Sequence, residues 1–160
     1  MGLEAHEAHR PMLTPRQIEL IQDSFATATK APEEVIENLF WRLFALDPGL
    51  RYLFPEDLTD LHRRFGFMLG FLIHRLDRWD EIAPRLRNLG VRHISYGVQA
   101  RHYETFGQAL METLNDVLLD ADSECIAAWN FLYERVSSTM IAAECEEFTV
   151  GASSDHMRAR

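Results

Sequence analysis

Apolar residues recur along most of this chain at the three- and four-residue spacing of amphipathic helices. Ile18, Ile21 and Phe25 form the first apolar stripe, and Thr14 followed by Pro15 is a typical start signal for the helix that carries it. No segment shows the strict apolar and polar alternation of a half-buried strand. The pattern therefore predicts an all-α protein.

The remaining helices are bounded by proline and by changes in periodicity. Pro32 opens the second helix, because a proline in the first turn loses no useful donor, and Asp47-Pro48 ends it and begins a short turn. A fourth segment carries Leu58, Leu61, Phe65, Met68, Leu69 and Leu72 at helical spacing, and further helices are expected over 81–96, 99–119 and 122 to about 148. Residues 1–13 and 150–160 lack this periodicity, which predicts one domain over 14–149 between two flexible tails.

Composition restricts the class of protein. A chain of 160 residues is one ordinary domain that can enclose a cofactor, and we expect no second catalytic domain. The formal charge of -9 argues against nucleic acid or anionic lipid as a partner. The longest apolar run, 65–73, is too short to span a bilayer, and the amino terminus lacks the features of a signal peptide. A cytoplasmic protein without membrane contact is expected.

His93 is the most informative candidate for chemistry. Ile82, Leu86 and Leu89 place its imidazole on the buried side of a helix that we expect to end at Gly97. Such a histidine is either a satisfied core residue or a ligand, since neutral imidazole binds ferrous and ferric iron well. The two cysteines, Cys125 and Cys145, lie twenty residues apart in the last predicted helix, about 30 Å at 1.5 Å per residue, and are not expected to pair.

The residues around His93 resemble those of a known family. The string Gly90-x-x-His93-x-x-Tyr96-Gly97-Val98, followed by His102-Tyr103 and Gly107-x-Ala109-Leu110, resembles the proximal segment of bacterial single-domain globins and of the haem domain of flavohaemoglobins. A second block, Leu43-Phe44-x-Leu46-Asp47-Pro48-x-Leu50-Arg51-x-Leu53-Phe54-Pro55, resembles the segment that carries the haem-stacking phenylalanine of these proteins. The resemblance covers roughly residues 14–149.

This resemblance implies a globin fold, with helices packed three over three around a b-type haem. It implies that His93 is the proximal iron ligand and that Phe54 stacks on the haem, with Val98, Tyr103, Phe106 and Leu110 closing the proximal side. On the opposite, distal side the family's usual tyrosine aligns with Phe40, its glutamine or histidine with Leu61, and a smaller aliphatic residue with Phe65. The chain departs from the family here, because every expected hydrogen-bond donor is missing.

Three polar residues could modify this pocket. His62 follows Leu61 directly, and either packs against a neighbouring helix or reaches the iron as a second ligand. Arg64 is placed to reach a haem propionate. Glu144 matches a glutamate that, beside Tyr103, lies near the proximal imidazole in flavohaemoglobin-like globins, where it would make His93 more basic; alternatively it belongs to a solvated acidic face.

The expected function is reversible binding of a diatomic gas: oxygen, nitric oxide or carbon monoxide. Oxygen transport or nitric oxide handling in a bacterial cell fits this expectation, with the protein as a monomer or homodimer. A haem-based gas or redox sensor is one alternative. A nitric oxide dioxygenase or peroxidase-like enzyme is another, and would need a separate reductase. The missing distal donors weigh against direct transfer of dioxygenase activity, because bound oxygen carries partial negative charge.

Overall fold

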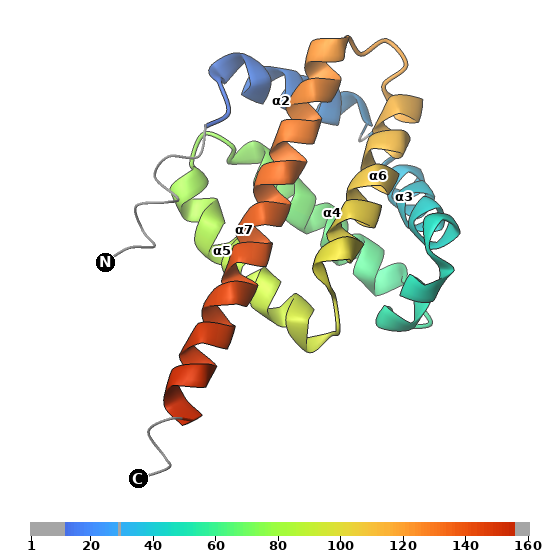
Figure 1. Ribbon diagram of the computed structural model, residues 1–160. Coiled ribbons are helices and arrows are strands. Elements are labelled where there is room, and N and C mark those ends of the chain that lie inside the picture. The colour runs from blue at the N-terminus through green and yellow to red at the C-terminus, as the bar shows by residue number, and fades with distance from the viewer. Residues whose placement is uncertain (1–11, 29, 156–160) are drawn as a thin grey trace.

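The structure, a computed structural model, describes residues 12–28 and 30–155, with side chains up to residue 143. Its elements, in chain order, are α2 (Pro15–Ala28), α3 (Pro32–Leu46), the 3-10 helix η1 (Pro48–Leu53), α4 (Thr59–His74), α5 (Trp79–Ser95), α6 (Ala100–Val117) and α7 (Ser123–Asp155) (Figure 1). The described ranges contain no strand, so the all-α prediction is confirmed. Most of the predicted amino-terminal tail lies outside the described residues.

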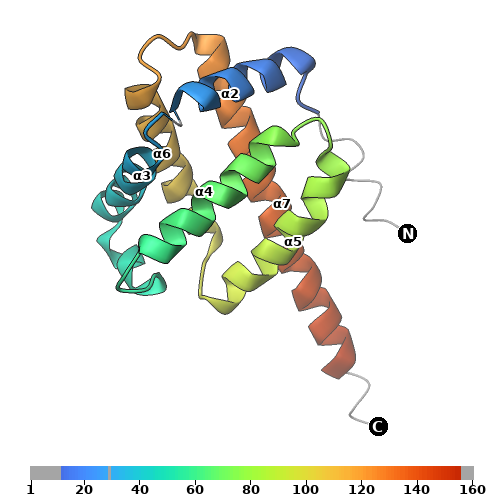
Figure 2. The ribbon, with the colours of Figure 1, turned by 180° about the vertical axis from the view of Figure 1, so that it is seen from behind.

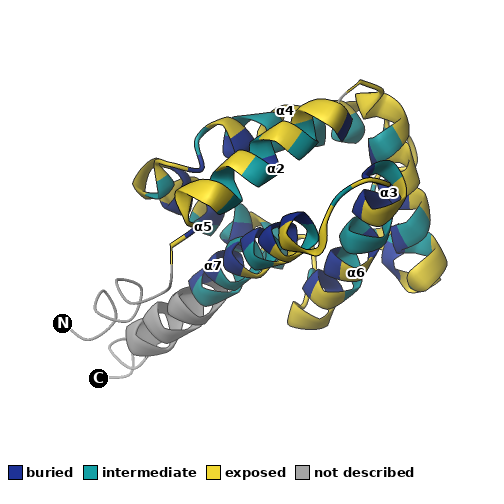
Figure 3. Ribbon diagram, turned by 90° about the horizontal axis from the view of Figure 1, so that it is seen from above, coloured by how far each residue is buried: buried dark blue, intermediate teal, exposed yellow. Residues whose placement is uncertain are grey.

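The helices form two layers of three. Seen from above, α2, α4 and α5 lie on one side and α3, α6 and α7 on the other, with their buried faces turned toward each other (Figure 3). Seen from behind, α4 crosses the molecule diagonally beside α5 (Figure 2). Helix α4 packs mainly on α3 and α2, whereas α5 packs along α7. Helices α4 and α5 are consecutive in the sequence, but they pack against different helices.

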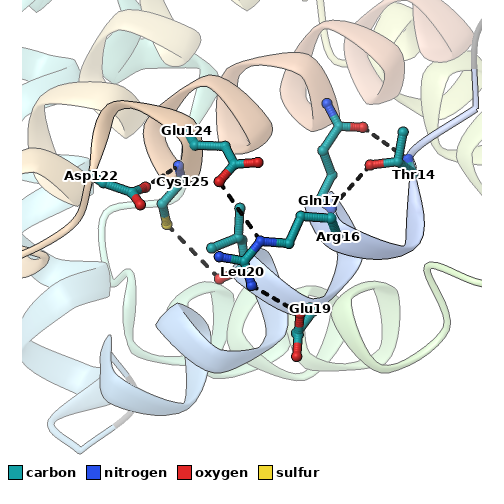
Figure 4. A network of polar contacts seen from close by, with 8 residues as sticks. All are labelled: Thr14, Arg16, Gln17, Glu19, Leu20, Asp122, Glu124 and Cys125. Atoms are coloured by element: carbon teal, nitrogen blue, oxygen red, sulfur yellow. Dashed lines mark hydrogen bonds and ion pairs between the residues drawn. The ribbon is translucent and has the colours of Figure 1, made fainter.

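Local capping fixes the starts of several helices. The backbone N–H of Thr14 donates to the side chain of Gln17 at 2.9 Å, and the backbone N–H of Gln17 donates to the Thr14 hydroxyl at 3.2 Å. This reciprocal pair satisfies two donors that a helix N-terminus otherwise leaves open. At the start of α7, the Asp122 carboxylate accepts from the backbone N–H of Cys125 at 2.8 Å. An Arg16–Glu124 ion pair at 3.7 Å joins the two helix starts across the surface (Figure 4).

The last helix is longer than the sequence predicts. Helix α7 continues to Asp155, whereas the sequence predicts an end near residue 148 and a tail from 150. The segment 149–155 contains no proline, and its single glycine costs a helix only about 1 kcal/mol relative to alanine. Loss of apolar periodicity therefore does not mark the end of this helix.

Buried side chains fall into two clusters. The larger one surrounds Trp129 of α7, which is fully buried and donates its indole N–H to the Ser24 hydroxyl at 2.8 Å. The smaller one, which we call the distal cluster, lies between α3, η1, α4 and α6. Its members and the partly buried residues packed on them are Ile36, Leu39, Phe40, Leu43, Phe44, Leu50, Leu53, Phe54, Leu61, Phe65, Phe106, Ala109 and Leu110. Leu110 packs against both clusters and so links them.

Glycine permits one very close helix crossing. A Cβ placed on Gly90 of α5 would lie 2.4 Å from the backbone carbonyl oxygen of Met140 in α7. No real Cβ approaches backbone so closely, so the two helices can cross at this spacing only because residue 90 has no side chain. This crossing lies one turn before His93 and sets the position of that turn against α7.

Candidate functional site

His93 lies in the last turn of α5, with its ring half-buried. Its Nδ1 lies 2.9 Å from the carbonyl oxygen of Leu89, one turn earlier in the helix. A carbonyl can only accept, so Nδ1 carries the proton and Nε2 keeps its lone pair. Burial lowers the pKa of His93, because a charged imidazole would be poorly solvated there. The result is a neutral, oriented imidazole with one ring nitrogen available to a metal.

The end of α5 is fixed by a tight glycine turn. Gly97 has a φ of 86°, a left-handed conformation that favours glycine. The backbone N–H of Gly97 donates to Ile94 at 2.9 Å, and that of Val98 donates to His93 at 3.0 Å. This pair of bonds is the Schellman motif, which confirms the prediction that the helix ends at this glycine. The backbone of His93 is therefore held both by its own helix and by the following turn.

Tyr103 lies beside the imidazole. The rings of His93 and Tyr103 are stacked, with centroids 6.3 Å apart and planes inclined by 24°. The Tyr133 hydroxyl donates to the backbone carbonyl of Tyr103 at 2.5 Å, and the Tyr133 ring stacks on Phe106 at 6.0 Å. Burial raises the pKa of the Tyr133 hydroxyl, so it stays protonated and can donate. Helix α7 thereby positions the α6 residues that lie next to His93.

Phenylalanine rings dominate the distal cluster. The Phe40 ring centroid lies 5.7 Å from that of Phe54, 5.7 Å from Phe65 and 6.3 Å from Phe106, all in edge-to-face arrangements. Phe65 and Phe106 also pack edge to face, at 5.9 Å. Leu61 packs against the same cluster. The structure thus brings together five of the residues that the sequence assigned to the cofactor pocket, and none of these five side chains can donate a hydrogen bond. Phe106, which the resemblance placed on the proximal side, packs here on Phe40 and Phe65 instead.

His62 lies against the outside of this cluster. Its ring centroid is 4.8 Å from that of Phe40, with the planes inclined by 34°. The Nε2 of His62 is buried, and within the described part of the chain it has no hydrogen-bond partner. A buried polar atom without a partner costs free energy, so it marks a place where a ligand, water or metal could bind.

The other predicted site residues are placed as follows. Val98 is partly buried and packs on the larger core, with Tyr103. Arg64 is exposed, and its Nε donates to the Asp60 carbonyl at 3.4 Å within α4. The backbone of Glu144 is helical, but its side chain lies outside the described residues, as does that of Cys145. The prediction that Glu144 contacts His93 therefore stays a prediction.

The residues fit a haem better than a metal ion bound by protein alone. Among the described residues, no group of three or more His, Cys, Asp or Glu side chains could enclose a metal ion. His93 offers one nitrogen, and the phenylalanine cluster and Leu61 offer an apolar wall. One imidazole plus apolar walls is the donor set that a haem requires, because the porphyrin supplies the other four iron ligands.

Three supporting residues, His102, Gly90 and Tyr133, were given no structural role from the sequence. His102 closes the capping box of α6, because its Nδ1 accepts from the backbone N–H of Gln99 at 3.0 Å. Gly90 allows the α5–α7 crossing, and a glycine inside an apolar-periodic helix is a signal of such close packing. Tyr133, which fixes Tyr103, gave no signal in the sequence, since its partner is thirty residues away.

Comparisons with known proteins agree with this arrangement. The family model for Globin matches residues 37–140, well over half of the chain. The flavohemoproteins of Bordetella parapertussis and Vibrio cholerae are 25% and 23% identical to it, over 90% and 83% of this chain. The chain spans only 37% and 35% of the lengths of these two relatives.

Solved structures show the same fold. A bacterial globin from Campylobacter jejuni superposes with a TM-score of 0.74 at 18% identity, covering 85% of this chain and 99% of that one. An engineered carbene transferase from Rhodothermus marinus gives a TM-score of 0.77 at 22% identity, covering 88% and 99%. The three-over-three helical arrangement is thus that of the globin fold, and the family model covers His93 and every member of the distal cluster except Ile36. The chain belongs to the globin family, whose members bind haem.

Proposed function

We propose that this globin binds one b-type haem through Nε2 of His93 and a diatomic gas on the opposite face. The observation that carries the proposal is the 2.9 Å contact between His93 Nδ1 and the Leu89 carbonyl. That contact leaves Nε2 as the donor atom, and the lowered pKa keeps it unprotonated. Haem iron held by this one imidazole would offer a binding position to oxygen, nitric oxide or carbon monoxide.

The chain's own residues set the conditions around that position. His93 donates an electron pair from Nε2, and its backbone is fixed by the Gly97 turn. Phe54 and Phe65 pack edge to face with Phe40 and so present an apolar wall that excludes water. Because Phe40, Leu61 and Phe65 carry no donor, we expect oxygen to be held more weakly than carbon monoxide, which binds with little charge separation.

A second candidate function is oxygen chemistry with nitric oxide or peroxide. The Tyr103 ring stacks on the His93 ring, at the position where an accompanying tyrosine was expected. The relatives are named flavohemoproteins, and the Rhodothermus marinus protein is named as a candidate nitric oxide dioxygenase. This chemistry would need electrons from a reductase. The chain spans little more than a third of the length of the flavohemoproteins.

Removal of the proximal imidazole tests the main proposal. His93→Gly should lose stoichiometric haem when purified, and added imidazole should restore a Soret band by filling the gap. His74→Gly is a suitable control, because His74 is exposed and lies at the end of α4. Haem content by the pyridine haemochrome method is the measurement, and it also identifies the haem as type b. Full haem with an unchanged Soret band in His93→Gly would overturn the assignment.

His62 is the second candidate ligand, and its role can be separated from that of His93. A low-spin, six-coordinate ferric spectrum that disappears in His62→Ala would identify it as the sixth ligand. A five-coordinate or water-bound spectrum, unchanged by His62→Ala, would leave it packed on Phe40, as its 4.8 Å ring contact indicates. The experiment is informative because the buried Nε2 has no hydrogen-bond partner among the described residues and so could bind a metal.

A further inference from the structure

A hollow of about 480 Å³ lies between α3 and the start of α4. Its volume falls within the range of about 300 to 1,000 Å³ that is usual for small-molecule sites. Glu37, Trp41 and Phe44 line it from α3, where their spacing of four and three residues places them on one face of the helix. The buried ring of Phe40 and the side chain of Leu58 complete its apolar lining. The hollow thus combines aromatic rings and an aliphatic side chain with one carboxylate.

Trp41 is the unusual member of this lining. It is 69% exposed, although tryptophan is usually well covered in a folded protein. The face of an indole ring carries negative charge density, and it attracts a cation that lies within about 6 Å of the ring centre. An exposed indole at the edge of a hollow is therefore a partner for a cationic ligand.

The charges around the hollow are also negative. Residues 31–62, which run from the start of α3 to the first turn of α4, carry seven acidic side chains and two arginines. Both arginines are held elsewhere: Arg42 pairs with two carboxylates of α6, and Arg51 donates to three backbone carbonyls between η1 and α4. No lysine or arginine of the described chain lines the hollow. The Glu37 carboxylate thus favours a cationic occupant and disfavours an anion.

The protein already uses one of these rings to hold a cation. The Arg51 guanidinium lies 5.4 Å from the centre of the Phe44 ring, a typical distance for a cation–π contact. Arg51 does not line the hollow, although Phe44 does. The ring of Phe44 is therefore stabilised by positive charge, and the chain leaves the hollow itself without a cation.

The lining favours a quaternary ammonium group over a primary one. A primary ammonium has three N–H donors, each of which loses free energy if it is buried without an acceptor. The apolar side chains of Phe40, Phe44 and Leu58 offer no acceptor. The methyl groups of a quaternary ammonium need none, and they gain from contact with aromatic and aliphatic surface.

We propose that the hollow between α3 and α4 binds a small quaternary ammonium ion, with its methyl groups against Trp41 and Phe44 and its charge beside Glu37. This goes beyond the proposed function, because the site requires neither haem nor gas. It gives the protein a second ligand, recognised by aromatic faces and one carboxylate.

A titration with choline and with its uncharged isostere tests the charge requirement. In dimethylbutanol a carbon atom replaces the nitrogen of choline, so the shape is kept and the charge is lost. Choline chloride should shift the indole N–H resonance of Trp41 saturably in the purified full chain, and dimethylbutanol should bind about tenfold more weakly. Trp79, which lies under the Arg135 guanidinium, and the fully buried Trp129 serve as internal references. Sodium chloride at equal concentration controls for ionic strength.

Two substitutions test the site, with the saturation-transfer signal of the choline methyl groups as the readout. Trp41→Leu keeps an apolar side chain but removes the aromatic face, and should weaken binding about tenfold. Glu37→Gln removes the charge at nearly constant shape, and should weaken binding about fivefold.

Each substitution has a matched control. Tyr52→Leu removes another aromatic side chain, which is 75% exposed and lies in η1 outside the hollow. Glu104→Gln removes an exposed carboxylate that lines a separate hollow of about 340 Å³ between α6 and α7. Both control variants should bind choline as the wild type does.

The proposal is overturned by any of three results. Equal binding of choline and dimethylbutanol would mean that the hollow recognises apolar shape and not charge. Unchanged choline binding in Trp41→Leu or in Glu37→Gln would place the ion elsewhere, and Glu37→Gln keeps this test available if Trp41→Leu does not fold. Absence of any saturable shift at Trp41 in the wild type would show that the hollow holds no such ion.

Discussion

Gly90→Ala should destabilise the protein, although alanine is the better helix former. The added Cβ would lie 2.4 Å from the carbonyl oxygen of Met140 and 2.9 Å from its carbonyl carbon and Cα. All three atoms belong to the backbone of α7, so no side-chain rotation can relieve the contact. The two helices would have to separate at the crossing one turn before His93.

The magnitude follows from two opposing effects. Replacing a glycine inside a helix by alanine gains about 1 kcal/mol in propensity. Forcing a methyl group into a packed contact costs about 1 to 3 kcal/mol, and more where backbone must move. Because the contacted atoms are backbone, we take a cost of about 3 kcal/mol, which leaves a net loss of about 2 kcal/mol in the free energy of unfolding. For a chain of this length that corresponds to a decrease of about 4 to 8 °C in the melting temperature.

Gly70→Ala is the control for this experiment. Gly70 also lies inside a helix, α4, but a Cβ placed there meets nothing within 4 Å. Gly70→Ala should thus keep the propensity gain and stabilise the protein by about 0.5 to 1 kcal/mol. Urea unfolding of both variants in the haem-free form measures the difference. Equal stability of Gly90→Ala and wild type would show that the α5–α7 crossing relaxes freely, and the reasoning would be wrong.

Three further predictions concern single side chains. Burial lowers the pKa of His102, whose Nδ1 accepts from the backbone N–H of Gln99. As the pH falls, the imidazole therefore takes up a proton in the unfolded chain before it does so in the folded one. The free energy of unfolding should decrease as the pH falls below about 6.5. His102→Gln should flatten that decrease in urea titrations at pH 5 to 7.5, and an identical slope would contradict it. Leu61→Gln should add the missing distal donor and slow oxygen release about ten- to a hundredfold, with much less effect on the release of carbon monoxide. Stopped-flow measurements give both rates. Similar changes for both gases would argue against a hydrogen bond to bound oxygen. Tyr133→Phe removes the donor to the Tyr103 carbonyl but keeps the ring stack on Phe106. It should lower the free energy of unfolding by about 0.5 to 1.5 kcal/mol, measured by urea unfolding. A decrease near zero would mean that the ring stack alone positions α6.

The sequence determined the helices and singled out His93, which we propose as the proximal ligand. Apolar spacing and proline signals act over one or two helical turns, so they can be read from the sequence without knowing the fold. Helices α2, α3 and η1 accordingly begin at the predicted prolines. Gly97 was predicted to end the helix of His93 because the left-handed turn is a local requirement, and it does. The predicted end of α7 near residue 148 is wrong, because apolar periodicity reports which residues face a core and not where helical hydrogen bonding ends.

Only the tertiary structure decided which side chains of α4 pack into the distal cluster and which lie outside it. Leu61 and His62 are adjacent in the sequence, yet their side chains differ in position. Leu61 packs into the distal cluster, whereas His62 lies on Phe40 and lines a hollow between α3 and the start of α4. Neighbouring positions on a helix differ by about 100° in direction, so a small rotation of α4 settles the assignment, and packing on α3 fixes that rotation. Contacts between residues far apart in the chain, such as Gly90 with Met140, likewise depend on how whole helices cross, which no local pattern encodes.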